Sequence, residues 1–267
     1  MVRRLTIEDS WPDSWKYSYP YDQQELWNEI THYGYAYGYE HRRRETLRLL
    51  QSVVPKGSSV LDVAGAQGNF SLVMAELGYD VTWNDLREDL AEYVERKREH
   101  GNITYAPGNV FELGFDSKFD AVLITEIIEH VAHPDEFLRK IGTMVKPGGY
   151  VIMSTPNGAY FKNNLPRFSD CEDPSQFEEM QFKPNLDGHI FLLWRDEVEA
   201  LAQKAGLHLE EHTTFTNPLT AGHVKLETAL KLLPKFVVDA IESTTALLPL
   251  TVRDKITTGS ASRFQRR

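Results

Sequence analysis

The chain has 267 residues, 41% of them hydrophobic and 11% aromatic, and a formal net charge of −10 at neutral pH. This length and composition exclude a disordered chain and predict one large domain or two small ones. The negative charge repels nucleic-acid phosphates and anionic lipid surfaces, so we expect neither as a partner.

Cysteine usage and the lack of targeting signals indicate the cytoplasm. The single cysteine, Cys171, excludes an internal disulfide and fits a reducing compartment. The first residues contain no apolar segment typical of a signal peptide, and charged residues interrupt the apolar stretches well before membrane-spanning length. We therefore expect a cytoplasmic protein without stable membrane insertion.

Residues 1–39 are unusually aromatic, with seven of the twelve tyrosines and three of the five tryptophans. Such a segment is too aromatic for a disordered tail and too short for a core of its own, so we expect it to pack over the rest of the protein as a lid. A helix is predicted from residue 40 to about 54, because Leu47, Leu50 and Val54 recur at helical spacing.

Strands and helices then alternate along the chain. Apolar runs predict strands at 60–64, 81–83, 103–105, 119–125, 150–155 and 207–215, and amphipathic stretches between them predict helices. This alternation indicates parallel βαβ units. The expected fold class is α/β: a Rossmann-like, doubly wound, mostly parallel sheet with helices on both faces, which binds its ligand at the carboxyl ends of the strands.

The main domain is predicted at 40–217. Within it, 158–189 is polar and rich in turn residues, so we interpret it as an insertion that acts as a lid or binding loop. Residues 218–267 are expected to form a helical C-terminal extension, with one or two amphipathic helices across 222–250. A final strand has one candidate, a poor one, within 257–265.

The strongest local signal is the segment VLDVAGAQGNF at 60–70. A turn of small residues directly after a buried strand lets the backbone approach a ligand closely. Asp85 follows Asp62 by 23 residues at the end of the second strand, where a carboxylate accepts hydrogen bonds from ribose hydroxyls. The G-x-G-x-x-G pattern of dinucleotide-binding proteins is absent from this segment.

This segment resembles the first motif, D-x-G-x-G-x-G, of class I S-adenosylmethionine-dependent methyltransferases. Residues 84–86 are similar to the ribose-binding motif of that family, 108–110 to its adenine motif, and 119–131 and 144–149 to its fourth strand and the following helix. Five motifs in the right order cover about 40–217. The chain therefore resembles the quinone-precursor and natural-product methyltransferases, which act on small molecules.

Two glycines of the first motif are alanines here, Ala64 and Ala66, and Ala66 narrows the space for the methionine end of the cofactor. The resemblance implies that the backbone at Ala64 and Gly65 holds the methionine amino group and that Gly68 opens the next helix. It also implies that Thr125 or Glu126 lines the methionine side.

Further roles follow from the same resemblance. Arg44 lies 16 residues before Val60, where related quinone-precursor enzymes carry an arginine for the cofactor carboxylate; a solvated helix face is the competing interpretation. Asp85 would bind both ribose hydroxyls, and Leu86 would pack on the adenine. Asn109 and Val110 would flank the base, with Asn109 in place of the usual aspartate.

Methyl transfer from a sulfonium requires that the acceptor be aligned with the methyl group and that water be excluded. A hydroxyl acceptor must also lose its proton. Glu126, Glu129 and His130 are spaced so that one helical turn would present them together. His130 is our candidate general base. Alternatively, the E-x-x-E-H pattern resembles the magnesium site of small-RNA 2′-O-methyltransferases and of metal-assisted quinone-precursor enzymes, with His189 as fourth ligand. In a third interpretation, His130 packs locally.

Three functions remain open. The first is methyl transfer to a small-molecule acceptor, for which we favour a hydroxyl oxygen as the acceptor atom. This acceptor would bind between the N-terminal segment, the 158–189 insertion and the helices after 222. The second is a metal-dependent RNA 2′-O-methyltransferase, against which the acidic charge and the lack of an RNA-binding module count. The third is a protein that binds S-adenosylmethionine without catalysis.

Overall fold

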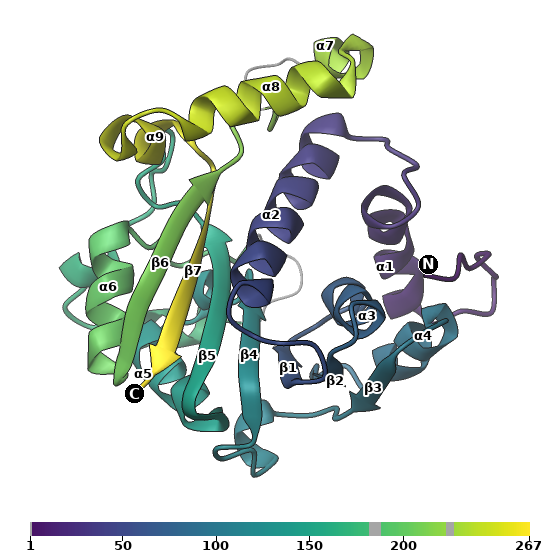
Figure 1. Cartoon of the computed structure of the whole chain (residues 1–267), viewed down its shortest axis with the longest axis horizontal. Coiled ribbons are helices and arrows are strands. Elements are labelled where there is room, and N and C mark those ends of the chain that lie inside the picture. Colours follow the sequence, from purple (N-terminus) through teal and green to yellow (C-terminus); the bar gives the residue numbers. More distant parts are fainter. Residues whose placement is uncertain (1, 182–187, 223–226) are drawn as a thin grey trace.

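One mixed sheet organises the computed structural model, which describes residues 2–181, 188–222 and 227–267 (Figure 1). In sheet order, its strands are β3 (Asn102–Tyr105), β2 (Asp80–Trp83), β1 (Ser59–Val63), β4 (Phe119–Thr125), β5 (Val145–Pro156), β7 (Gly259–Arg266) and β6 (Leu207–Phe215). Strands β1 to β5 pair in parallel, and β7 is antiparallel to β5 and β6. The strand order reverses between β1 and β4, which is the position where such sheets bind ligands. The expected fold class is confirmed.

Helices cover both faces of the sheet (Figure 1). They are α1 (Asp13–Glu25), α2 (Tyr33–Gln51), α3 (Asn69–Glu76), α4 (Leu90–Lys97), α5 (Pro134–Met144), α6 (Arg195–Lys204), α7 (Glu227–Leu232), α8 (Lys235–Ala246) and α9 (Leu250–Ile256). Pro234 and Pro249 directly precede α8 and α9. Two parts of the predictions lie outside the described residues: 182–187 of the predicted insertion and 223–226 of the predicted C-terminal helices. None of the described helices has the length and apolar character needed to cross a membrane.

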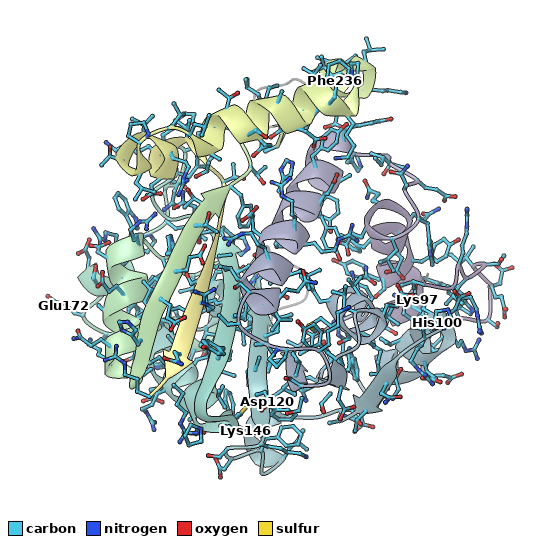
Figure 2. All side chains as sticks on the ribbon, in the orientation of Figure 1. Lys97, His100, Asp120, Lys146, Glu172 and Phe236 are labelled. Carbon is cyan, nitrogen blue, oxygen red and sulfur yellow. The ribbon has the colours of Figure 1, made fainter. Side chains whose placement is uncertain are left out.

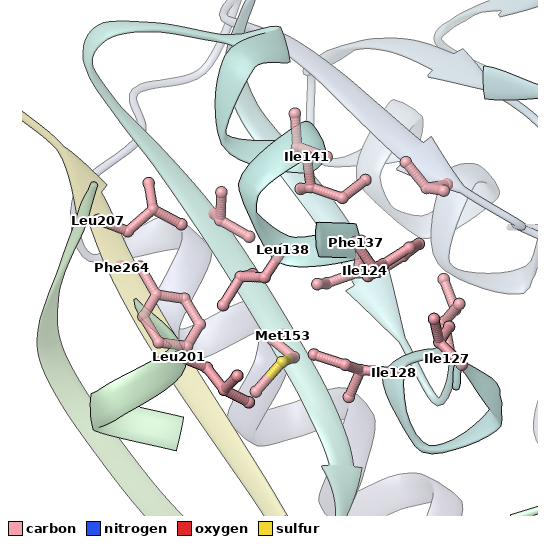
Figure 3. Packing of buried hydrophobic residues seen from close by; sticks show 14 of the residues in the cluster. Ile124, Ile127, Ile128, Phe137, Leu138, Ile141, Met153, Leu201, Leu207 and Phe264 are labelled. Carbon is pink, nitrogen blue, oxygen red and sulfur yellow. The ribbon is translucent and has the colours of Figure 1, made fainter. Parts of the chain in front are cut away.

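Two apolar layers hold the helices to the sheet. On one face, α2 and α3 bury Leu50 and Met74 against β1, β4 and β5. On the other face, α5 and α6 bury Ile141 and Leu201 against the same strands and against Phe264 of β7 (Figure 3). Burial of these side chains supplies the main driving force for the layered arrangement and leaves the carboxyl ends of the strands to carry the site.

Residues 218–267 do not form a helical extension to their end, because Gly259–Arg266 forms β7 inside the sheet. The poor strand candidate within 257–265 is thereby confirmed. Polar residues of this strand are buried through specific hydrogen bonds. The Ser260 hydroxyl donates to the Thr155 carbonyl at 3.2 Å, and Ser262 bonds to His212 Nδ1 at 2.8 Å. Since buried serines give no alternation of apolar and polar residues, the hydrophobic pattern marks this strand poorly.

Helix α2 begins at Tyr33, so the predicted start at residue 40 is wrong and the boundary of the lid segment at 39 falls inside the helix. The first part of α2 is rich in tyrosine and glycine, which are weak helix formers. The Glu227 carboxylate accepts hydrogen bonds from the Tyr33 and Gly34 backbone amides and so caps the helix. A cap from a residue so distant in the chain leaves no local sequence signal.

Candidate functional site

The turn after β1 has the backbone of a ligand-binding bend. Ala64, Ala66 and Gly68 have positive φ angles of 50°, 47° and 75°. Alanine adopts this left-handed region at a conformational cost, and such strain gathers at functional sites. Between the alanines, a Cβ at Gly65 would lie 2.8 Å from Trp83 Cδ1, so this position accepts no side chain. Gly68 opens α3 as expected.

Asp85 lies beside this turn. Its side chain is 6% exposed, and its Oδ2 accepts a hydrogen bond from the Ala66 amide at 2.9 Å. Its Oδ1 accepts from the Arg87 amide at 2.9 Å and from Arg87 Nε at 3.1 Å. The carboxylate is therefore held at the carboxyl end of β2 next to a strained bend, which is the arrangement that binds ribose hydroxyls in related folds.

A cavity of about 300 Å³ opens over the turn. The turn, the end of β4 and the two N-terminal helices share its lining: Tyr17, Ser18, Tyr21, Glu25, Tyr35, Tyr39, Arg42, Asp62, Ala64, Gly65, Ala66, Gln67, Asn69, Phe70, Arg87, Thr125 and Glu126. Thr125 and Glu126 line this cavity, and their place on the methionine side stays a prediction. Asp85 lies behind Arg87, which pairs with its carboxylate.

Two of the residues expected around the adenine line a separate hollow. Leu86 is 60% exposed, and with Asn109 it lines this hollow of about 300 Å³. Val110 does not line it and is buried in the apolar core between the sheet and α5. The Asn109 side chain accepts a hydrogen bond from the Phe111 amide at 3.2 Å and so caps a short 3-10 helix.

The N-terminal segment is fastened to the turn by a buried ion pair. Lys97 is labelled in Figure 2. Its Nζ on α4 lies 2.7 Å from Asp22 Oδ2 of α1, with both side chains fully buried. The same ammonium donates to the Gln67 carbonyl at 2.7 Å and to Asn69 Oδ1 at 3.0 Å. Burial lowers the pKa of Lys97, and Asp22 opposes this shift. This cation therefore joins α1, which covers the cavity, to the turn at Gln67 and Asn69.

The expectation at Arg44 is corrected by the structure. Arg44 points to solvent and pairs with its neighbour Glu45 at 3.3 Å. Arg42 lines the cavity instead, and its guanidinium lies 3.0 Å from Glu126 Oε2. Two residues along a helix correspond to a rotation of about 200°, so only one of these arginines can face the site. Although burial opposes it, Glu126 and Glu25 raise the pKa of Arg42.

The helical turn expected at 126–130 is also wrong. Glu126 has a φ of 54°, and Ile128–His130 forms a separate 3-10 turn before α5. Glu126 accepts a hydrogen bond from the Ser154 hydroxyl at 3.0 Å and pairs with Arg42, so it does not join the proposed metal ligands.

Three of the four proposed metal ligands do come together. Ligand atoms of Glu129, His130 and His189 lie within 4.8 Å of one another. Glu129 is fully buried, and its Oε2 accepts a hydrogen bond from the Thr155 hydroxyl at 3.0 Å. Burial raises the pKa of Glu129 well above its ordinary value, and Glu126 adds to this shift.

A second cavity, of about 310 Å³, lies on the other side of the Arg42–Glu126 pair. It shares four residues with the first cavity, and its full lining is Gly34, Tyr35, Gly38, Tyr39, Arg42, Glu126, Pro156, Phe215, Thr216, Ala221, Thr258 and Gly259. A third cavity, of about 620 Å³, adjoins it at Pro156 and Thr258 and is lined by the insertion and His189. His130 does not line the first or the second cavity.

Sequence reasoning missed several residues of this site. The helical phase of α2 could have indicated Arg42, Tyr39 and Gly38, had the start of the helix been known. Thr216 and Thr258 carry no signal, because the antiparallel strand β7 brings them to the site.

The fold and the turn define a Rossmann-like class I methyltransferase. The structure of phosphoethanolamine N-methyltransferase 2 from Haemonchus contortus, in complex with S-adenosyl-L-methionine, is similar with a TM-score of 0.54 at 19% identity. The similarity covers 84% of this chain and 52% of that one. Identity at this level supports the fold alone.

The chain matches the methyltransferase domain family over residues 37–212 and belongs to that family. It is 29% identical over 202 residues to a ubiquinone biosynthesis O-methyltransferase from Hydrogenovibrio crunogenus, covering 72% of this chain and 79% of the relative. A relative of the same name from Caulobacter vibrioides is 38% identical over 106 residues, which span 38% of this chain and 42% of that protein. The expected class I methyltransferase is thereby confirmed.

Proposed function

We propose that this chain transfers the methyl group of S-adenosylmethionine to a hydroxyl oxygen of a small molecule. The observation that carries the proposal is the buried Asp85 carboxylate, 2.9 Å from the backbone amide of a strained, small-residue turn. The relatives named as ubiquinone biosynthesis O-methyltransferases support oxygen as the acceptor atom.

The residues present fit this cofactor. Asp85 would accept hydrogen bonds from the ribose hydroxyls after Arg87 moves aside, and Leu86 and Asn109 would lie along the adenine. The buried Arg42 Nε has no hydrogen-bond partner among the described residues. A guanidinium with a donor to spare fits the carboxylate of the methionine end, the role expected of Arg44. When bound, the cofactor supplies an activated methyl carbon for in-line displacement.

The second cavity is the proposed acceptor site. It shares Tyr35, Tyr39, Arg42 and Glu126 with the cofactor cavity, so an acceptor there meets the methionine end. A pocket bordered by α2 and the strand ends would align the hydroxyl, and an acceptor that fills it would displace water, which is the main requirement of this reaction.

His130 is retained as the proposed general base. Its half-buried imidazole belongs to the 3-10 turn at Ile128–His130 and lines none of the three cavities. Its ring centroid lies 4.8 Å from that of His189, which does line the third cavity. We expect His130→Asn to lower kcat about 100-fold or more while the Kd for S-adenosylmethionine is unchanged. An unchanged kcat would exclude His130 as the base.

The deciding experiment incubates the protein with methyl-labelled S-adenosylmethionine and a panel of phenols, sugars, carboxylates and RNA. Label on a phenol or sugar hydroxyl supports the proposal. Label on RNA that a chelator abolishes and magnesium restores supports the RNA alternative, with Glu129, His130 and His189 as ligands. Cofactor binding without transfer supports the non-catalytic alternative, and calorimetry that detects neither the cofactor nor its demethylated product contradicts all three. The cytoplasmic location stays a prediction.

A further inference from the structure

Two glycines, Gly34 and Gly38, lie one turn apart inside α2, and both line the second cavity. Glycine in a helix interior lowers stability relative to alanine, because it loses more backbone freedom on folding. Each glycine therefore calls for a physical reason.

The two glycines differ in what surrounds them. A Cβ at Gly34 would lie 2.4 Å from the Ala221 carbonyl oxygen, so packing against the chain requires glycine there. At Gly38, apart from its two chain neighbours and the adjacent backbone of α2 itself, no atom of the described residues lies within 4 Å of the position that a Cβ would take. Its backbone is helical, so no positive φ requires glycine either. The empty space beside Gly38 belongs to the cavity.

Gly38 also lies close to the reacting end of the site. Arg42 follows it by four residues on the same face of α2, which is about 6 Å along the helix axis. Arg42 pairs with Glu126 at the border between the two cavities. A side chain at position 38 would therefore occupy the space next to the point where acceptor and methyl group meet.

We propose that Gly38 is a specificity-determining residue: the absence of a side chain there makes room for the body of the acceptor and sets the size of hydroxyl compound that reaches the methyl group. This inference rests on the proposed function, because it takes the second cavity as the acceptor site.

The first test needs no knowledge of the acceptor. Gly38→Cys and, as a matched control, Thr46→Cys are made in a Cys171→Ser background, since Cys171 is the single native cysteine. Thr46 lies on the same helix but is fully buried. We expect a small methanethiosulfonate to modify the thiol introduced at position 38 at least about 100-fold faster than the thiol at position 46, because reactivity follows exposure. Equal rates would overturn the inference, since the space beside Gly38 would then be closed.

The second test measures size selection. Gly38→Ala and Gly38→Leu both introduce good helix formers, so we expect thermal stability to be equal to or above that of the wild type. With labelled S-adenosylmethionine, catechol and 4-tert-butylcatechol are compared as acceptors. We expect Gly38→Leu to lower kcat/KM for 4-tert-butylcatechol at least about tenfold more than for catechol, with an intermediate effect of Gly38→Ala and a cofactor Kd within about twofold of the wild type.

The outcomes separate the inference from the proposed function. Equal losses for both catechols in a variant that binds the cofactor normally would overturn the role of Gly38 in size selection. A wild-type protein that binds S-adenosylmethionine but methylates neither catechol counts against the proposed acceptor class. In that case the rate of thiol modification alone decides whether Gly38 borders an open cavity.

Discussion

The two cavities that meet at Arg42 are built in different ways. The floor of the cofactor cavity comes from the turn at 62–70 and from Arg87, and hydrogen bonds of the buried side chains of Asp62, Asp85 and Lys97 hold this part of the chain. The acceptor cavity is assembled from α2, the ends of β5 and β6, and the start of β7, and its walls are mostly small or aromatic. The cofactor region should therefore respond to changes of charge, and the acceptor region to changes of size.

The largest expected effect is on stability, and it comes from the buried ion pair between Lys97 and Asp22. Asp22→Asn leaves the Lys97 ammonium fully buried without its carboxylate partner. Breaking such a pair costs about 3–5 kcal/mol in the free energy of unfolding. Urea denaturation measures the loss. The control is Glu92→Gln on the same helix, which breaks an exposed pair with Arg96 and should cost about 1 kcal/mol or less. Similar losses for both variants would show that burial does not distinguish the two pairs.

The next effect is a dependence of stability on pH. Burial raises the pKa of Asp62 to about 7 from an ordinary value of 3.8, although the Ser71 hydroxyl opposes this shift with a hydrogen bond at 2.6 Å. The folded state therefore binds the proton more tightly, and the stabilisation it brings is present below pH 3.8 and is lost as pH rises through about 7.

Asp62→Asn should remove this dependence. Between pH 4 and pH 7, the wild type should lose stability relative to the variant, by at most about 4 kcal/mol for a pKa difference of this size. Urea denaturation of the cofactor-free proteins at several pH values provides the measurement. Parallel pH curves for the two proteins would mean that the Asp62 carboxyl titrates normally.

A third effect concerns the ribose site. Asp85→Ala removes a carboxylate that would accept two hydrogen bonds from the ribose, each of which contributes about 1.5–3 kcal/mol when one partner is charged. We expect the Kd for S-adenosylmethionine to rise at least about 100-fold in calorimetry. Asp80→Ala, at the exposed start of the same strand, should leave the Kd unchanged. An Asp85→Ala protein that binds normally would remove the main support for the proposed function.

The contrast between local and distant contacts in the two cavities explains how much of the fold and of the site could be predicted from the sequence. The turn at 64–68 and the nearby Asp85 could be predicted because strand, bend and carboxylate follow one another locally. The start of α2 could not, because Glu227 determines it from a distant segment. The sequence offers only a poor candidate for the strand β7, at 257–265, because its buried serines are paired through contacts with distant strands. A residue such as Thr258 enters the site only once those segments have come together.

The smallest expected effect is on cofactor binding, and it tests Arg42, which lines both cavities. Arg42→Ala should weaken S-adenosylmethionine binding about tenfold to 100-fold, as expected for loss of a charge-assisted hydrogen bond of about 1.5–3 kcal/mol. Arg44→Ala should change the Kd less than about twofold, because its exposed guanidinium pairs with Glu45 away from the cavity. Decarboxylated S-adenosylmethionine identifies the contact: without the carboxylate, wild type and Arg42→Ala should bind equally. If Arg42→Ala weakens both compounds alike, its effect comes from the unpaired Glu126 and not from the cofactor carboxylate.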